Sequence, residues 1–224
     1  MDFVFNLDTE VASTAGGSGG SFGTMETGVY DVTIVTATLG KTKSKNNCID
    51  LSLVTADGHE KTIYQAFILD EKWATGSVNH GYKDWMAFAV VMGLKGITTF
   101  NKPLVKEDGS PVMKNGQPVV LNAVKELDGK KCKLAIVKEL DFYKGEVTED
   151  NIVFASFTEA GLNANEKINS LDPEALGKLD GRLSDKKTKR LKAHIANGGS
   201  AEVSGDTNED KQEPEVDDSD LGLD

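Results

Sequence analysis

Hydrophobic and polar residues alternate along three stretches of the first third of the chain, which is the pattern of strands with one buried face. These stretches are residues 28–39, 48–55 and 61–69. In the second stretch, Ile49 and Leu51 lie on one face and the intervening residues on the other. A hairpin signal, Asp-Gly, separates the second stretch from the third. The pattern therefore predicts three consecutive strands.

The periodicity then changes to that of a helix in residues 80–94. Four apolar residues repeat there with the spacing of one helix face: Trp85, Phe88, Ala89 and Met92. Alternation returns in residues 132–141 and 151–158, which predicts two more strands. Three strands, a helix and two strands is the element order of the OB fold, although other small α+β domains share it. We expect a mainly β protein, a five-stranded OB-fold barrel with a helix between strands 3 and 4.

The remaining segments divide the chain into four parts. Residues 1–23 combine a short alternating stretch with a Gly/Ser-rich linker, and residues 24–158 form the OB-fold domain. Residues 159–197 are expected to be a helical, basic extension, and residues 198–224 a disordered acidic tail. Within the domain, the turn signals of residues 103–118 predict a protruding hairpin or ordered loop.

Two helix starts are predicted in the extension. The first is Asp172-Pro173-Glu174, with aspartate as the N-cap and proline at the first helical position. The second is Ser184, which would cap an additional C-terminal helix over residues 184–197 that ends at Gly198. This second segment is strongly basic.

The net charge of −11 argues at first against a nucleic-acid binder. Its distribution reverses that argument. Residues 198–224 contain ten acidic residues and one lysine, so the tail carries −9 and the other 197 residues carry −2. The acidity is confined to one segment, and the lysines of the body are free to form a basic surface.

No pattern of catalytic or metal-binding residues is present. The two cysteines, Cys48 and Cys132, are far apart and are expected to be reduced and buried, as in a cytoplasmic protein. The three histidines have no ligand spacing. Gly40-Lys41-Thr42 lacks the upstream glycine of a phosphate-binding loop. We therefore expect no enzyme activity, no cofactor and no metal, and we expect neither a secretory signal nor a membrane span.

Lysines near aromatic residues are the positive signal. A protein that binds single strands needs cationic groups for phosphates and aromatic rings on which bases stack. The candidate DNA-binding residues are Lys41, Lys43, Lys45, Tyr64, Phe67, Trp73, Lys130, Lys131, Lys138 and Tyr143. The alternative for the lysines is solubility alone, and for Trp73 and Tyr143 it is a packed anchor of a loop. Tyr64 and Phe67 have opposite parity on their strand, so one of them is expected in the core.

Residues 24–158 resemble the phage-encoded single-stranded DNA-binding proteins of the OB type. The resemblance rests on the segments GVYDVTIVTA, TKSKNNCIDLSLVTADG and LDGKKCKLAIVKE, together with a third strand that ends in FIL and a helix that ends in VVMGLKG. It implies binding of single-stranded DNA without strong sequence preference during replication, recombination or repair, in the host cytoplasm. Two alternatives stay open: a recombination accessory protein with weak DNA affinity, and a structural virion component. The sequence does not determine the oligomeric state, and a homo-oligomer is one of the possible states.

The tail extends the resemblance, because single-strand-binding proteins of bacteria and phages commonly end in an acidic segment. In that family the tail competes with DNA for the basic groove and recruits replication or recombination proteins. The corresponding residues of this chain are Asp217, Asp218, Asp220, Leu221 and Leu223. The alternative is a tail that only keeps the protein soluble.

Overall fold

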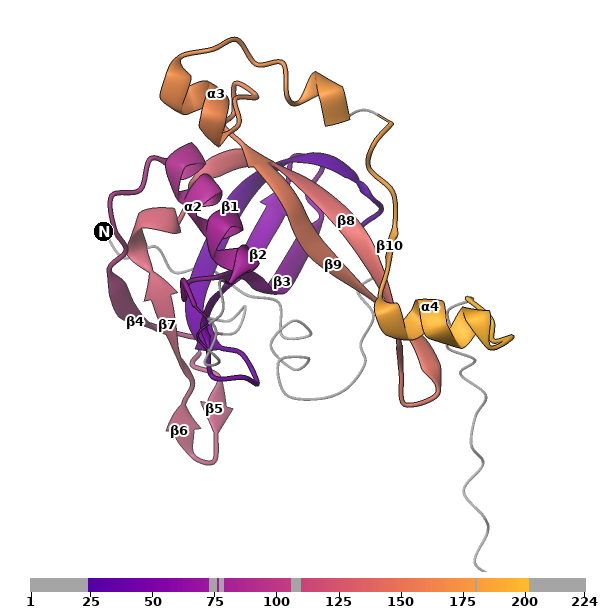
Figure 1. Ribbon diagram of the computed structural model, residues 1–224. Coiled ribbons are helices and arrows are strands. Elements are labelled where there is room, and N and C mark those ends of the chain that lie inside the picture. Colours follow the sequence, from indigo (N-terminus) through magenta and orange to yellow (C-terminus); the bar gives the residue numbers. More distant parts are fainter. Residues whose placement is uncertain (1–23, 73–75, 77–78, 106–109, 180, 202–224) are drawn as a thin grey trace, which may run out of the picture.

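The computed structural model describes residues 24–72, 76, 79–105, 110–179 and 181–201, and the chain is mainly β (Figure 1). The segments 1–23 and 202–224 lie outside the described residues, and so do Trp73 and the five tail residues named above. The expectations for them therefore stay predictions. No helix in the described part of the chain is long and apolar enough to span a membrane.

The central sheet has the strand order β9-β8-β1-β2-β3. Strands β1 (Gly28–Lys41), β2 (Asn47–Thr55) and β3 (Glu60–Ile68) form the predicted antiparallel meander. β8 (Lys131–Tyr143) returns to pair with the first half of β1, and β9 (Glu146–Phe157) pairs with β8. β3 and β9 lie close together, but none of their residues pair, so the sheet is open at this seam. All five predicted strands are confirmed, but a closed barrel is not found.

Helix α2 (His80–Met92) supplies the largest aromatic side chains of the core. The Asn79 side chain caps its start by accepting from the Gly81 N–H, and Gly93 ends it with a left-handed backbone, φ 67°. The rings of Trp85 and Phe88 pack on Phe67 of β3, with centroid distances of 6.1 and 4.3 Å. The predicted helix is therefore confirmed, and its apolar face is the one that is buried.

Between α2 and β8 the chain forms two strand pairs, one that widens the sheet and one that forms a separate two-stranded sheet. β4 (Thr99–Pro103) pairs with β7 (Val120–Val124). β7 also pairs with β1 at Thr38 and Ala123, in the half of β1 that does not pair with β8. β5 (Met113–Lys114) and β6 (Gln117–Pro118) form the predicted protruding hairpin. A 3₁₀ turn, η1 (Lys125–Leu127), connects β7 to β8. The sequence analysis did not predict β4 and β7.

The first half of the extension differs from the prediction. Asp172-Pro173-Glu174 does not begin an α-helix: Gly177, a poor helix former, follows within one turn. The Glu174 and Ala175 N–H groups donate to the buried Glu166 carboxylate, at 2.9 and 2.6 Å. The chain continues into a 3₁₀ turn, η2 (Gly177–Leu179). The α-helix lies earlier, at α3 (Ala164–Asn169), where Asn163 and Glu166 form a reciprocal capping box.

The second half of the extension contains a helix, but its cap is not Ser184. Residues Lys186–Lys187 form strand β10, which pairs in parallel with β8. Thr188 then caps α4 (Lys189–Ala196) by accepting from the Leu191 N–H at 3.2 Å. Because the strand takes up the residues that follow Ser184, the helix begins five residues later than predicted. The extension is thus basic but only partly helical.

Candidate nucleic-acid interface

The loop between β1 and β2 presents three predicted lysines to solvent. It is a compact turn in which the Thr42 N–H donates to the Asn46 carbonyl at 2.8 Å, and the Asn46 N–H donates to the Thr42 hydroxyl at 3.1 Å. Asn46 is buried beneath the turn. The exposed side chains are Lys41, Lys43 and Lys45. None of the three forms an ion pair with a described residue, so their charges are available to an anion.

Asp70, which follows β3, fixes the base of this loop. Its carboxylate accepts from the Asn47 backbone N–H at 2.6 Å and from the Asn47 side-chain amide at 2.8 Å. The Leu69 N–H donates to the Asn47 carbonyl at 2.9 Å. The Asn47 side chain also accepts a hydrogen bond from the Lys41 Nζ at 3.3 Å, whereas Lys43 and Lys45 take no part in these contacts.

The two candidate aromatics of β3 have opposite environments. Tyr64 is 54% exposed on the outer face of the sheet, on the same side as the hydrogen-bonded Ser52 and Thr62 hydroxyls. Phe67 is 3% exposed and lies in the core against Trp85 and Phe88. The prediction that Phe67 contacts DNA is therefore wrong. A base can stack only on a ring with an exposed face, and the ring of Phe67 is buried in the core.

Tyr64 lies in an acidic environment. Partial burial raises the pKa of its phenol, and the carboxylates of Asp50 and Asp150 raise it further. Desolvation also raises the pKa of Asp50, although this carboxylate accepts from the Gln65 N–H at 2.6 Å. Carboxylates repel phosphates, so a base can pack on the Tyr64 ring only if the phosphates lie to the side, over the lysines.

Two other predicted lysines hold the fold together. Lys130 donates to the Met92 carbonyl at the end of α2, at 3.1 Å. Lys138 pairs with Glu26 at 2.8 Å and with Glu149 at 3.8 Å, and its hydrogen bond to Glu26 raises its pKa. The charge of Lys138 is thus neutralised within the protein, and we correct it to a structural role; Lys130 is held against the end of α2, and its contact with DNA stays a prediction. Lys131 is exposed and remains a candidate.

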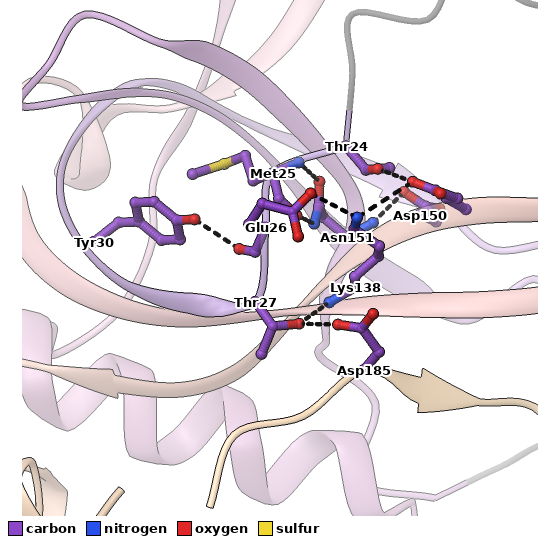
Figure 2. A network of polar contacts seen from close by, with 10 residues as sticks. Thr24, Met25, Glu26, Thr27, Tyr30, Lys138, Asp150, Asn151 and Asp185 are labelled. Carbon is purple, nitrogen blue, oxygen red and sulfur yellow. Dashed lines mark hydrogen bonds and ion pairs between the residues drawn. The ribbon is translucent and has the colours of Figure 1, made fainter. Parts of the chain in front are cut away.

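Figure 2 shows the network that occupies Lys138. The buried Asn151 accepts from the Met25 N–H at 2.8 Å and donates to the Met25 carbonyl at 2.9 Å. The Thr27 hydroxyl accepts from the Lys138 N–H at 3.0 Å and donates to Asp185 at 2.6 Å. The network joins the start of the domain, the β8–β9 hairpin and the segment that leads into β10.

The tip of the β8–β9 hairpin combines an aromatic ring with cations. Tyr143 is 47% exposed, with the Lys144 Nζ 5.4 Å and the Arg190 Cζ 5.5 Å from its ring centroid. The neighbouring Phe142 is partly covered by His194. Sequence reasoning selected Tyr143 but not the cations around it, although the basic run of residues 186–192 was the signal that could have found them.

The two basic regions lie toward the same end of the molecule. The β1–β2 loop and the tip of the β8–β9 hairpin both project toward the lower part of Figure 1. Tyr64 and the outer face of β2 and β3 belong to the same sheet. The arrangement is suited to an extended polyanion with aromatic groups. In comparisons with known proteins, no family model and no curated protein matches the chain.

Proposed function

We propose that the protein binds single-stranded DNA without strong sequence preference, on an OB-type fold. The strand order supports the fold: a three-strand meander, a helix, and a hairpin that returns to the first strand. The OB fold is a partly open barrel, so an unpaired seam between β3 and β9 is compatible with it. Ligands of this fold lie over the second and third strands, between the loop after the first strand and the loop of the last hairpin.

One observation carries the proposal: both of those loops carry exposed cations that form no ion pair with a described residue. They are Lys41, Lys43 and Lys45 in the first loop, and in the second Lys144, whose Nζ lies 5.4 Å from the ring centroid of Tyr143. Lysines neutralise phosphates regardless of sequence, and a tyrosine ring stacks on any base, at about 1–3 kcal/mol per base. The exposed Tyr64 offers a second ring between them.

The role that fits this activity is to coat and protect single strands during replication, recombination or repair. The acidic tail would modulate DNA binding and recruit partner proteins. A recombination accessory protein with weak DNA affinity and a virion component are the competing functions. No specific observation in the described part of the chain favours either of them.

The test is a fluorescence anisotropy titration of labelled oligo(dT) over a series of salt concentrations, with duplex DNA of the same length as the comparison. We expect tighter binding to the single strand and a log–log salt slope of about −0.7 per phosphate neutralised. Lys43→Glu combined with Lys45→Asn should weaken binding and reduce the slope. Asparagine is chosen because Lys45 has a positive φ of 67°, which asparagine tolerates.

The control is Lys95→Glu, which reverses the charge of an exposed lysine after α2 and so reproduces the Lys43→Glu half of the double variant. This variant should leave binding nearly unchanged, and any small loss of affinity that it shows measures the effect of net charge alone. Equal affinity for duplex and single strand, or an affinity that does not change with salt, would contradict the proposal. Absence of binding at low salt would favour the virion component.

A further inference from the structure

We infer that β10, α4 and the tip of the β8–β9 hairpin form a second phosphate-binding surface, which lengthens the site beyond the β1–β2 loop. We call it the C-terminal basic surface and define it by Lys144, Lys187, Lys189, Lys192 and the ring of Tyr143. The inference rests on the proposed function. It adds to the proposed binding site the segment of the chain that would hold the far end of the single-stranded DNA.

The segment is built onto β8, not loosely attached to it. Lys186 and Lys187 pair with Glu139 and Leu140, and the Thr188 N–H donates to the Leu140 carbonyl at 2.9 Å. This ladder lies where β1 no longer covers β8. The position of the surface relative to the hairpin is therefore set by backbone hydrogen bonds.

Side chains fix the orientation of α4. Leu191 is fully buried, and His194 stacks on Phe142 with ring centroids 3.7 Å apart. Arg190 forms an ion pair with Asp141 and also lies against the ring of Tyr143. These residues commit one side of the helix to the hairpin. Lys189 and Lys192 are exposed to solvent.

The basic side chains of this segment fall into two groups, those paired with acidic residues and those exposed without a pair. Two basic side chains of the segment are neutralised internally, Lys186 by Glu139 at 2.9 Å and Arg190 by Asp141. The four lysines of the C-terminal basic surface are exposed and form no ion pair within the described residues. Two acidic residues lie nearby in sequence: Asp185, which accepts a hydrogen bond from Thr27, and Glu146, the strand partner of Tyr143. With Glu139 and Asp141 they make four acidic residues against the six basic residues of positions 144 and 186–192, so the local charge stays positive.

A single strand matches this surface better than an acidic protein does. Tyr143 exposes almost half of its surface beside Lys144, so a base can stack on the ring while an adjacent phosphate contacts a cation. An acidic segment would use the lysines but leave the ring without a partner. We therefore assign the surface to the sugar–phosphate backbone, with one stacked base at the hairpin tip.

The experiment compares three full-length variants with the unmodified protein, in salt titrations of a short and a long labelled oligo(dT). In Lys189→Glu/Lys192→Glu, the salt slope for the long oligonucleotide should fall by about 1.4, from two phosphates at about 0.7 each. The short oligonucleotide, which the β1–β2 loop alone accommodates, should be much less affected. Tyr143→Ala should weaken binding of the long oligonucleotide, and Tyr143→Phe should restore it.

Lys178→Glu is the matched control, because Lys178 is an exposed lysine of the same extension that is already paired with Glu174 at 2.6 Å. Circular dichroism checks that α4 is intact in every variant. If the unmodified protein binds DNA and both surface variants bind the long oligonucleotide with an unchanged slope, this inference is wrong and the proposed function stands. If the unmodified protein does not bind, the proposed function itself fails.

Discussion

The ring of Phe142 and the imidazole of His194 lie face to face, with centroids 3.7 Å apart and planes inclined by 11°. A methyl group on Gly199 would come within 2.0 Å of the His194 Nε2 atom, so alanine at position 199 must displace either the ring or the backbone. We expect Gly199→Ala to loosen α4 from the hairpin. Limited proteolysis should then cleave α4 faster than in the unmodified protein.

Gly177→Ala is the control for this substitution, because a methyl group there has no neighbour within 4 Å and needs no unusual backbone conformation. Its proteolysis rate should match that of the unmodified protein. Equal resistance of α4 in both variants would show that the stack does not hold the helix.

Removing the side chain of Asn151 should destabilise the whole domain. Asn151→Ala leaves the N–H and the carbonyl of the buried Met25 without partners, at about 1–3 kcal/mol for each unsatisfied group. Urea unfolding followed by circular dichroism measures the loss. Asn122→Ala, at an exposed position of β7, is the control and should change stability little. A similar loss in both variants would contradict a specific role for Asn151.

Glu166 should make the extension sensitive to acid. Backbone hydrogen bonds, first from Asn163 and then from Ala175 and Glu174, lower the pKa of its carboxyl group below the usual glutamate value. A lowered pKa in the folded state means that the ionised form stabilises the fold. This stabilisation is complete above the ordinary pKa of about 4.3 and is lost as the pH falls through the lowered value.

Amide hydrogen exchange over residues 163–176, measured at decreasing pH, tests this expectation. Protection should decrease in acid, after correction for intrinsic exchange rates. Glu166→Gln should lose that protection already at neutral pH. Protection that is independent of pH in the unmodified protein would rule out the carboxylate as the organising group.

Local sequence patterns predicted the parts of the fold that depend on neighbours in sequence. The alternation of Ile49 and Leu51 required only a sheet with one buried face, and both side chains are fully buried. The capping box of Asn163 and Glu166 was equally local and could have been recognised. By contrast, the two-residue strand β10 has no periodicity, and it exists because β8 extends beyond β1.

The candidate site was harder to predict, since the role of a lysine depends on partners that are distant in sequence. Lys138 is neutralised by Glu26, which lies 112 positions away. Lys41 and Lys43 form no ion pair with a described residue, although the Lys41 Nζ donates a hydrogen bond to the neutral Asn47 side chain at 3.3 Å. Sequence alone gives all of these lysines the same weight.

Neither thiol should react in the native protein. Burial, assisted by nearby carboxylates, raises the pKa of Cys48 to about 11 and that of Cys132 to about 12. At pH 8 about one Cys48 thiol in a thousand is then ionised, and the thiolate is the reactive form. Both thiols are also 1% exposed. A thiol-reactive dye should label two groups in guanidinium chloride and label the native protein only very slowly; rapid native labelling would contradict the burial of these residues.

Removing residues 202–224 should tighten binding to single strands at low salt. This segment carries −9 and continues from the residues just after α4, so we expect it to compete with DNA at an effective concentration of about millimolar. Salt screens the competition, so the gain should vanish at high ionic strength. The chain is cut after Ala201 to keep Gly199 beside His194. Paired titrations of the full-length and truncated proteins test this; unchanged or weaker binding at low salt would reject the competition.

One edge of β8 is covered by two different strands in succession. β1 covers it as far as Ile136, the Thr27 hydroxyl accepts the Lys138 N–H, and β10 covers Glu139 and Leu140. A strand edge with unpaired backbone groups is a template on which other chains can assemble. By covering this edge, β10 should also disfavour self-association. A protein cut before Lys186 should keep its core but expose a short unpaired strand edge at the hairpin, with which another chain could pair.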